Sequence, residues 1–397
     1  MIPVYEALKI IKRETRSLER ETIDLENSIG RVLAEEIRAD MDLPPFNRSQ
    51  MDGFAVLASD TKNAPVRLKI IGESVAGKGF DEKLKSGEAV RIMTGAPVPV
   101  GANAVQKIEL TREIDGFIEI LETTKLKQNI VHRGEEIVKG SKIFDGGEII
   151  SENMIAAIAS FGYAKLKVSR KPKAAILATG SEIVEISETP KTDQIRNSNS
   201  IMLKVFAEKA GAESGVLPIV KDDLQNLKST IRNAAEICDV LIISGGVSVG
   251  DYDFTKPALH ELGAEIFFEK ISLKPGKPMV FAKLNDTLIF GLPGNPVSVA
   301  VTFYLFVRTA ILQMQGAKNC ELKKGFAVVS GKIKSAKERD SFLPVSVETD
   351  ANGKLIIESL RFSGSSNFIA FSRANALVFV PQGKDLTNGD IAGIAFI

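Results

Sequence analysis

Beyond Pro172, short apolar segments alternate with longer segments of helical periodicity. The apolar segments are 174–179, 214–220, 239–244, 264–271, 278–284 and 287–292, and the helical segments are 199–210, 223–237 and 296–315. Short, uncharged runs rich in β-branched residues are typical of buried strands in parallel sheets. Their alternation with helices predicts a doubly wound parallel sheet.

The rest of the chain has different sequence patterns. Residues 1 to about 40 have a helical pattern, whereas 41–140 is β-rich, with a hairpin predicted at Asp115-Gly116. A helical pattern returns over 151–162. The last stretch, about 80 residues long, is again β-like and predicts a small sandwich or barrel. We therefore expect several domains, with the first β-rich segment inserted between discontinuous pieces.

Charge and cysteine usage narrow the class of protein. Lys and Arg number 51 against 50 Asp and Glu, so no global field favours nucleic acid or an anionic membrane. Cys238 and Cys320 lie far apart with no C-x-x-C pattern, which indicates a reducing cytoplasm. The charged N-terminus does not fit a signal peptide, and the longest uncharged apolar stretch, 296–307, is shorter than the roughly 20 residues of a spanning helix.

A glycine-rich turn follows the strand predicted at 239–244. Gly245, Gly246 and Gly250 can bring backbone N–H groups close to an anion, because ligands of open α/β sheets bind beyond the carboxyl ends of strands. Asp251 and Asp253 add hard oxygen ligands beside that turn. The combination predicts a phosphorylated substrate bridged to a divalent cation.

Three further turns follow predicted strands. ATGSE at 178–182 ends in Glu182, a candidate metal ligand or general base. FGLPGNP at 290–296 leads into a helix, with Asn295 as the expected N-cap and Pro296 near the first helical position. The segment around 272–280 is rich in lysine and stiffened by prolines, which suits an oxyanion better than an ordinary solvated loop. Its lysines are Lys270, Lys274 and Lys277.

For the other polar segments, a structural role is the commoner interpretation. Asp52-Gly53 reads as a tight turn, and Thr94 lies in a loop constrained by Gly and Pro. Arg133 could meet a phosphate, although an exposed Arg/Glu pair is the commoner arrangement. The sequence contains no P-loop and no G-x-G-x-x-G after a strand, and its two histidines suggest no nucleophilic dyad or triad. Metal-assisted chemistry is the better fit.

Several long strings resemble one family in order along nearly the whole chain. They are 44–56, 91–105, 131–140, 178–182, 244–254, 272–278 and 290–304. They resemble the molybdopterin molybdotransferase family of the MoeA type, which includes the E domain of gephyrin. The resemblance implies insertion of molybdenum from molybdate into adenylylated molybdopterin, with Mg²⁺-dependent cleavage of the phosphate anhydride and release of AMP.

The resemblance also implies an architecture and an assembly. The expected domains are an α/β domain similar to molybdopterin adenylyltransferase (1–20 plus 171–318), a small mixed α+β linker domain (21–40 plus 141–170), an inserted β-rich domain (41–140) and a C-terminal β-barrel (319–397). Family members form an elongated homodimer, whose active cleft lies between the sheet domain of one subunit and the inserted domain of the other. Adenylylated molybdopterin must come from a separate molybdopterin adenylyltransferase.

Functional residues are carried over by motif. The resemblance implies catalytic importance for Asp52, Thr94, Glu182, Asp222, Asp253, Lys270 and Lys274. It implies cofactor binding by Gly245, Gly246, Ser248, Gly250, Lys277, Pro293, Gly294, Asn295 and Pro296, and Mg²⁺ binding by Glu182, Asp251 and Asp253. Many relatives have an acidic residue where this chain has Asn47 and an aspartate where it has Ser181.

Two other functions are compatible with these patterns. A molybdopterin adenylyltransferase uses a similar sheet domain, but the inserted domain and the C-terminal barrel argue against it. A gephyrin-like dimeric scaffold is the second alternative, and the carboxylates and lysines named above favour catalysis over it.

Overall fold

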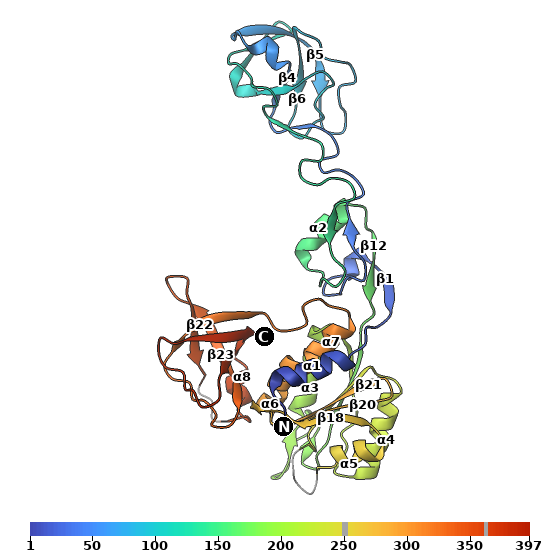
Figure 1. Cartoon of the computed structure of the whole chain (residues 1–397). Helices are drawn as coiled ribbons and strands as arrows, with labels where there is room; N and C mark the ends of the chain where they lie inside the picture. The colour runs from blue at the N-terminus through green and yellow to red at the C-terminus, as the bar shows by residue number, and fades with distance from the viewer. Residues whose placement is uncertain (248–252, 361–363) are drawn as a thin grey trace. The chain divides into compact units, whose positions relative to one another are not determined.

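The computed structural model describes residues 1–247, 253–360 and 364–397, which fall into two compact units (Figure 1). The larger unit comprises 1–35, 146–152 and 165–397. The smaller unit comprises 36–145 and 153–164.

A six-stranded sheet forms the centre of the larger unit. Its strand order is β16 (Glu213–Val216), β13 (Lys173–Ala178), β17 (Val240–Ser244), β21 (Thr287–Leu292), β20 (Pro278–Leu284) and β18 (Glu265–Lys270). The first four strands are parallel, as predicted, but β20 runs antiparallel to both of its neighbours. The predicted parallel sheet therefore includes one antiparallel strand, because the links on both sides of β20 are too short for a crossover helix.

Helices cover both faces of this sheet (Figure 1). One face carries α1 (Val4–Glu14), α3 (Ser198–Lys209), α6 (Pro296–Thr302), the π-helical segment η4 (Phe303–Val307) and α7 (Arg308–Met314). The other face carries α4 (Leu224–Ala235) and α5 (Thr255–Glu261). Alternate strand residues supply the two cores, with Ile242 on one side and Ile243 on the other. The doubly wound fold is thereby confirmed.

The continuous helical segment 296–314 is the one helix among the described residues that is long and apolar enough to cross a membrane. Within its 18-residue apolar window, 78% is buried inside the protein. It packs against α1 and α3 in the sheet core. Its apolar character is therefore that of a core helix, as the sequence predicted.

A closed β-barrel forms the C-terminal part of the larger unit. Its strands are β19 (Leu273–Lys274), β22 (Lys324–Ser330), β23 (Asp340–Thr349), β24 (Leu355–Ser359), β25 (Ala376–Val380) and β26 (Ile391–Phe396). The pairing of β23 with β25 closes the ring, and a short helix, α8 (Phe368–Phe371), lies between β24 and β25 in sequence. Of the two expected forms, sandwich or barrel, the barrel is observed.

The N-terminal region contains less helix than predicted. Only α1 is α-helical within the first 40 residues, because β1 (Arg20–Asp24) pairs along its whole length with β12 (Lys165–Ser169). A single 3₁₀ turn, Leu25–Asn27, follows β1. The partner strand lies far away in sequence, so the local pattern could not indicate this pairing.

The smaller unit is built on a second six-stranded sheet. Its strands are β4 (Gly53–Val56), β5 (Val66–Ser74), β6 (Glu88–Ile92), β7 (Ala104–Lys107), β8 (Thr111–Ile114) and β9 (Phe117–Ile120). The hairpin between β8 and β9 is confirmed, with φ of 47° at Asp115 and 80° at Gly116. Short strands and one helix complete the unit: β2 (Ile37–Arg38), β3 (Arg48–Ser49), β10 (Ile130–Val131), β11 (Lys142–Phe144) and α2 (Glu152–Ser160).

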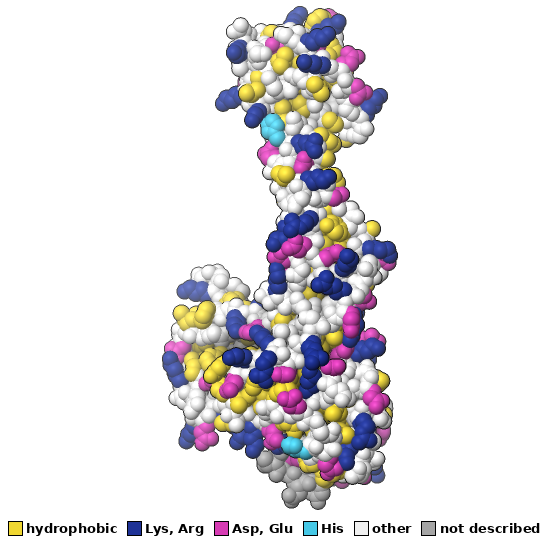
Figure 2. Space-filling view, turned by 45° about the vertical axis from the view of Figure 1, so that its right-hand side comes forward, with side chains coloured by type: hydrophobic (Ala, Val, Ile, Leu, Met, Phe, Trp, Pro, Cys, Tyr) yellow, Lys and Arg dark blue, Asp and Glu magenta, His cyan; other side chains and the backbone are white. Residues whose placement is uncertain are grey.

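Charges of both signs are interspersed on the face shown in Figure 2. This distribution agrees with the formal net charge of +1. An anion-binding site would therefore depend on local geometry rather than on a global field.

Candidate functional site

Three neighbouring parallel strands of the larger unit end in register. Ala178 of β13, Ser244 of β17 and Leu292 of β21 are paired across the sheet, so the turns that follow them meet at one edge. They line a cavity of about 380 Å³. The sequence-predicted residues in its wall are Glu182, Asp222, Gly245, Gly246, Asp253, Pro293, Gly294 and Asn295. The structure thus brings together three of the predicted turns.

The turn after β17 requires glycine at two positions. Gly245 has φ of 100°, and a Cβ there would lie 2.5 Å from the carbonyl oxygen of Thr179. Gly246 has φ of 64°, and a Cβ there would lie 2.7 Å from Oγ1 of Thr255. L side chains rarely adopt this backbone region. These two residues therefore allow the backbone to pass close against the end of β13. Both line the cavity, and the Gly245 N–H donates to the Leu292 carbonyl at 3.2 Å.

Three carboxylates line the cavity. Oδ2 of Asp222 accepts a hydrogen bond from the backbone N–H of Ser181 at 3.0 Å, and Oγ of Ser181 accepts one from the backbone N–H of Asp222 at 3.3 Å. This reciprocal pair fixes the turn after β13 against the segment that follows β16. Glu182 lines the same cavity from the turn after β13, and Asp253 lines it from the segment between β17 and α5.

The carboxylates of this cavity are the candidate ligands of the predicted Mg²⁺. Among the described residues, no group of three Asp, Glu, His or Cys side chains is close enough to hold a metal ion alone. Mg²⁺ usually binds one or two carboxylates and completes its octahedron with water and substrate phosphates. Glu182 and Asp253 fit a shared site of that kind. Ser248, Gly250 and Asp251, which the sequence also singled out, lie outside the described residues.

The three predicted lysines lie at the same edge of the sheet but not in the cavity wall. β18 ends at Lys270, and it runs parallel to β21 because both are antiparallel to β20. Lys274 and Lys277 are exposed on the connection to β20, and Pro278 at its end does line the cavity. The described side chains in the wall include none of these lysines.

Asn295 does not cap the helix that follows it, although the sequence predicted this. The helix begins at Pro296 as expected, but the Asn295 side chain makes no capping hydrogen bond. Its Nδ2 instead donates to Oγ of Ser365 at 2.9 Å, and Val297 N–H donates to the carbonyl of Ser365 at 3.1 Å. Asn295 therefore ties the turn to the C-terminal barrel.

A second cavity, of about 780 Å³, adjoins the first. Thr179, Glu182, Gly245, Gly294 and Asn295 line both cavities. The paired strands β14 (Ile183–Val184) and β15 (Ile195–Arg196) contribute to its wall.

Sequence reasoning missed several residues of this second cavity. Asn199, near the start of α3, had a recognisable signal, because Asn and Ser cluster before that helix. Ser366 and Phe368 had none, because they come from the barrel and reach the cavity only through tertiary packing.

In the smaller unit, two further predicted residues are joined. Oδ1 of Asp52 accepts hydrogen bonds from the backbone N–H of Thr94 at 2.6 Å and from its hydroxyl at 2.9 Å. These bonds, the backbone one first, lower the pKa of Asp52 below its usual value. Asp52 is exposed, so it presents an ionised, oriented carboxylate at the surface of this unit.

Arg133 has a structural role, but its partner is an aspartate and not the glutamate of the default interpretation. Its Nε donates to Oδ2 of Asp42 at 2.6 Å, and its backbone N–H donates to Oδ1 of Asn47 at 2.8 Å. Asp42 also accepts from the backbone N–H of Lys139 at 2.8 Å. Arg133 thus braces neighbouring segments of the smaller unit.

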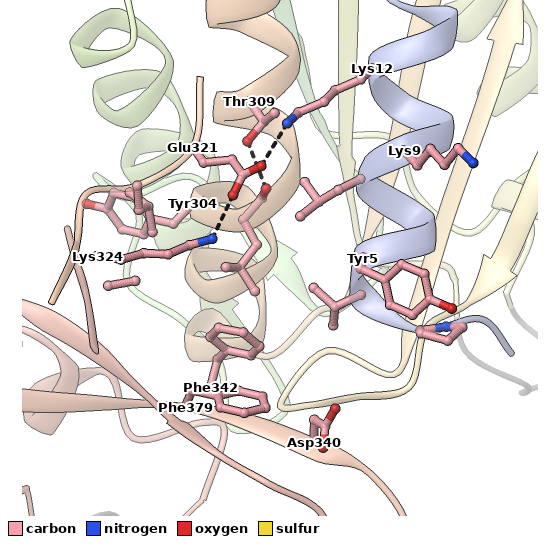
Figure 3. Close-up of a pocket in the computed structure, with 16 residues that line it drawn as sticks. Tyr5, Lys9, Lys12, Tyr304, Thr309, Glu321, Lys324, Asp340, Phe342 and Phe379 are labelled. Atoms are coloured by element: carbon pink, nitrogen blue, oxygen red, sulfur yellow. Dashed lines mark hydrogen bonds and ion pairs between the residues drawn. The ribbon is translucent and has the colours of Figure 1, made fainter. Parts of the chain in front are cut away.

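A third cavity, of about 730 Å³, lies between α1, the long helix and the barrel (Figure 3). Its wall is largely apolar, and three of its charged groups pair with one another, since Glu321 accepts from Lys12 at 2.7 Å and from Lys324 at 2.8 Å. These bonds lower the pKa of Glu321 to about 2. None of the sequence-predicted site residues lines this cavity.

Family profiles match three parts of the chain. "MoeA N-terminal region (domain I and II)" matches residues 2–162, "Probable molybdopterin binding domain" matches 175–313, and "MoeA C-terminal region (domain IV)" matches 327–394. The second of these includes the turns at the edge of the larger sheet.

Whole-chain comparisons agree with these matches. A molybdopterin molybdenumtransferase of Staphylococcus aureus (strain MSSA476) is 35% identical over 96% of this chain and 92% of its own, and one of Staphylococcus epidermidis (strain ATCC 12228) is 34% identical over 99% and 94%. A crystal structure of the molybdopterin biosynthesis MoeA protein of Pyrococcus horikoshii OT3 is 31% identical and covers both chains completely, with a TM-score of 0.86. With its three profile matches and this full-length similarity, the chain belongs to the MoeA family of molybdopterin molybdenumtransferases, which act in molybdenum cofactor biosynthesis.

Proposed function

We propose that this chain is a molybdopterin molybdotransferase. It inserts molybdenum from molybdate into adenylylated molybdopterin, with Mg²⁺-dependent cleavage of the phosphate anhydride and release of AMP. The observation that carries the proposal is the convergence of a glycine turn with Glu182, Asp222 and Asp253 in one cavity of a chain of this family. Such a site combines amides for phosphate oxygens with carboxylates for a divalent cation.

Each part of the cavity has a role in the proposal. The backbone N–H of Gly246 binds phosphate oxygens, whereas that of Gly245 donates to the Leu292 carbonyl at 3.2 Å and holds the turn in place. The predicted roles of Ser248 and Gly250 in cofactor binding fall outside the described residues. Glu182 and Asp253, with Asp251, hold Mg²⁺, which when bound supplies charge neutralisation at the phosphates. Lys270, Lys274 and Lys277 neutralise pyrophosphate or molybdate oxygens as these approach the edge of the sheet. Pro293 and Pro296 fix the third turn.

Asp52 and Thr94 complete the site in this proposal. The two hydrogen bonds from Thr94 hold the Asp52 carboxylate ionised, so it accepts a hydrogen bond from the attacking water or the reacting group. We propose that they come from the partner subunit of a homodimer. A separate molybdopterin adenylyltransferase supplies the substrate, and the reactions take place in the cytoplasm. The finer division of the chain into four domains stays a prediction.

The direct test is an anaerobic assay with adenylylated molybdopterin, Mg²⁺ and molybdate. We expect AMP release and molybdenum incorporation together, and loss of both in Asp253→Ala and in Asp52→Ala. AMP release with no metal incorporation would show that the protein acts only as a hydrolase. Formation of adenylylated molybdopterin from ATP, with no need for molybdate, would favour the adenylyltransferase alternative.

Subunit mixing tests the intersubunit site separately. Dimers that combine one Asp52→Ala chain with one Asp253→Ala chain contain one intact site if the two residues act across the interface. We expect activity to return in these mixed dimers, whereas a site within one chain predicts that they stay inactive. A tight peptide partner combined with an inactive insertion assay would support the scaffold alternative.

A further inference from the structure

The second cavity described above differs in chemistry from the first. It shares five lining residues with the carboxylate cavity, and its volume of about 780 Å³ suits an organic ligand. Ile186, Ile195 and Phe368 line it and are 51%, 58% and 49% exposed. The apolar area on its wall would be covered by a ligand that extends from the phosphate side.

Phe368 reaches this cavity through a fixed attachment of the barrel. The Asn367 side chain caps α8 by accepting from Ala370 N–H at 3.1 Å. Ser365, three residues before Phe368, makes the two hydrogen bonds to Asn295 and Val297 described above. The aromatic ring is therefore carried on a segment that is fastened to the turn after β21.

Asn199, which lines the same cavity, has a buried amide oxygen behind the wall. Its Nδ2 donates to the carbonyl oxygen of Gly294 at 2.7 Å and to Oγ of Ser244 at 3.0 Å. A carbonyl can only accept, so this contact fixes which end of the amide is nitrogen. Oδ1 of Asn199 is then buried with no hydrogen-bond partner among the described residues. Buried acceptors are normally paired, so a ligand N–H is a natural partner for it.

We propose that Phe368 is a substrate-binding residue that stacks on a planar nitrogen heterocycle of the substrate, while Oδ1 of Asn199 accepts a hydrogen bond from that ring. The C-terminal barrel thereby takes part in substrate binding. This inference rests on the proposed function, because adenylylated molybdopterin carries two such rings, a pterin and an adenine. Both are linked to the phosphates that the adjoining cavity would bind.

Binding measurements with the two halves of the substrate identify the ring. Molybdopterin and AMP are titrated separately, anaerobically and with Mg²⁺, into wild-type protein, Phe368→Ala and Phe368→Tyr. Stacking on an aromatic side chain contributes about 1 to 3 kcal/mol per base, so Phe368→Ala should weaken the binding of one ligand by roughly 5- to 150-fold. Phe368→Tyr should restore the affinity. A selective loss for molybdopterin assigns the pterin, and one for AMP assigns the adenine.

Ile369→Ala is the matched control, because Ile369 neighbours Phe368 on α8, is 66% exposed and does not line the cavity. It should bind both ligands as the wild type does. In the complete reaction, Phe368→Ala should raise the KM for adenylylated molybdopterin more than it lowers kcat. If the wild type binds either ligand and Phe368→Ala binds molybdopterin and AMP as tightly as the wild type does, the stacking role is overturned while the proposed function stands. If the wild type binds neither ligand, both are overturned.

Discussion

Thr94 donates both its backbone N–H and its hydroxyl to a single oxygen of Asp52, which fixes the carboxylate at the start of β4 against the loop after β6. Two residues that the sequence could only describe as separate turns are therefore one polar unit. Its oxygen is held in one orientation before any substrate arrives. Such preorganisation is the usual requirement of a group that orients a reacting water.

Thr94→Val should raise the pKa of Asp52 towards its ordinary value of 3.8, because it removes the hydroxyl donor and keeps the backbone donor. The pKa is lowered in the folded protein, so the linked stability is present above the ordinary pKa and is lost as pH falls through the folded value. At neutral pH the carboxylate stays ionised, and any lost activity reflects its orientation. An NMR titration of the Asp52 carboxyl measures the shift. Thr94→Ser keeps both donors, so the pKa of Asp52 in this variant should equal that of the wild type. An unchanged pKa of Asp52 in Thr94→Val would show that the hydroxyl does not lower it.

Gly245→Ala should destabilise the larger unit by about 2 kcal/mol or more, because it combines a left-handed backbone with a Cβ 2.5 Å from the Thr179 carbonyl. Urea unfolding measures this cost. Gly215→Ala is the control in strand β16 of the same sheet, where a Cβ would meet nothing within 4 Å. Its unfolding free energy should stay near that of the wild type. Similar stability of the two variants would show that the turn relaxes to accept a side chain.

Asp239→Asn should lower the unfolding free energy of the larger unit, because Asp239 makes hydrogen bonds at the start of β13 and β17. Asp239 accepts from both Nη atoms of Arg170, at 2.7 and 2.8 Å, and from Lys173 N–H at 2.7 Å. Burial alone would raise its pKa, but these hydrogen bonds outweigh burial and lower it. Solvent screens the pair in part, so we expect a loss of about 1 kcal/mol at pH 7.

The acid dependence of this variant follows from the same pKa direction. The stabilisation by Asp239 is complete above its ordinary pKa of 3.8 and declines as pH falls below it. The difference in unfolding free energy between wild type and Asp239→Asn should therefore shrink in acid. A difference that grows as the pH falls would contradict this account.

Removal of Mg²⁺ should abolish AMP release with little effect on folding. The described carboxylates form no three-membered metal cage, so the ion would be shared with substrate phosphates rather than required by the fold. Activity and melting temperature, each measured with EDTA and after Mg²⁺ is restored, separate the two effects. A large drop in melting temperature without substrate would indicate a structural metal instead.

The alternating pattern beyond Pro172 was sufficient to predict the doubly wound sheet and the meeting of its strand ends. Parallel neighbours must end at one edge, so Glu182, Gly245 and Asn295 could be grouped before any coordinates. The direction of β20 and the pairing of β1 with β12 were missed, since both depend on chain connections and partners that periodicity does not encode. The place of Phe368 in the cavity wall could not be predicted either, because it depends on how the barrel packs.

The pairing of β19 with β23 joins Leu273 to Asp340 and Lys274 to Ser341, and Arg339 donates to the Leu273 carbonyl at 3.2 Å. The lysine-bearing connection of the sheet is thus also a strand of the barrel. Deleting the barrel would leave that connection without one of its hydrogen-bonded edges, so the two domains cannot be treated as exchangeable modules. A substitution in β23 could change how the lysines are presented while leaving every cavity residue intact.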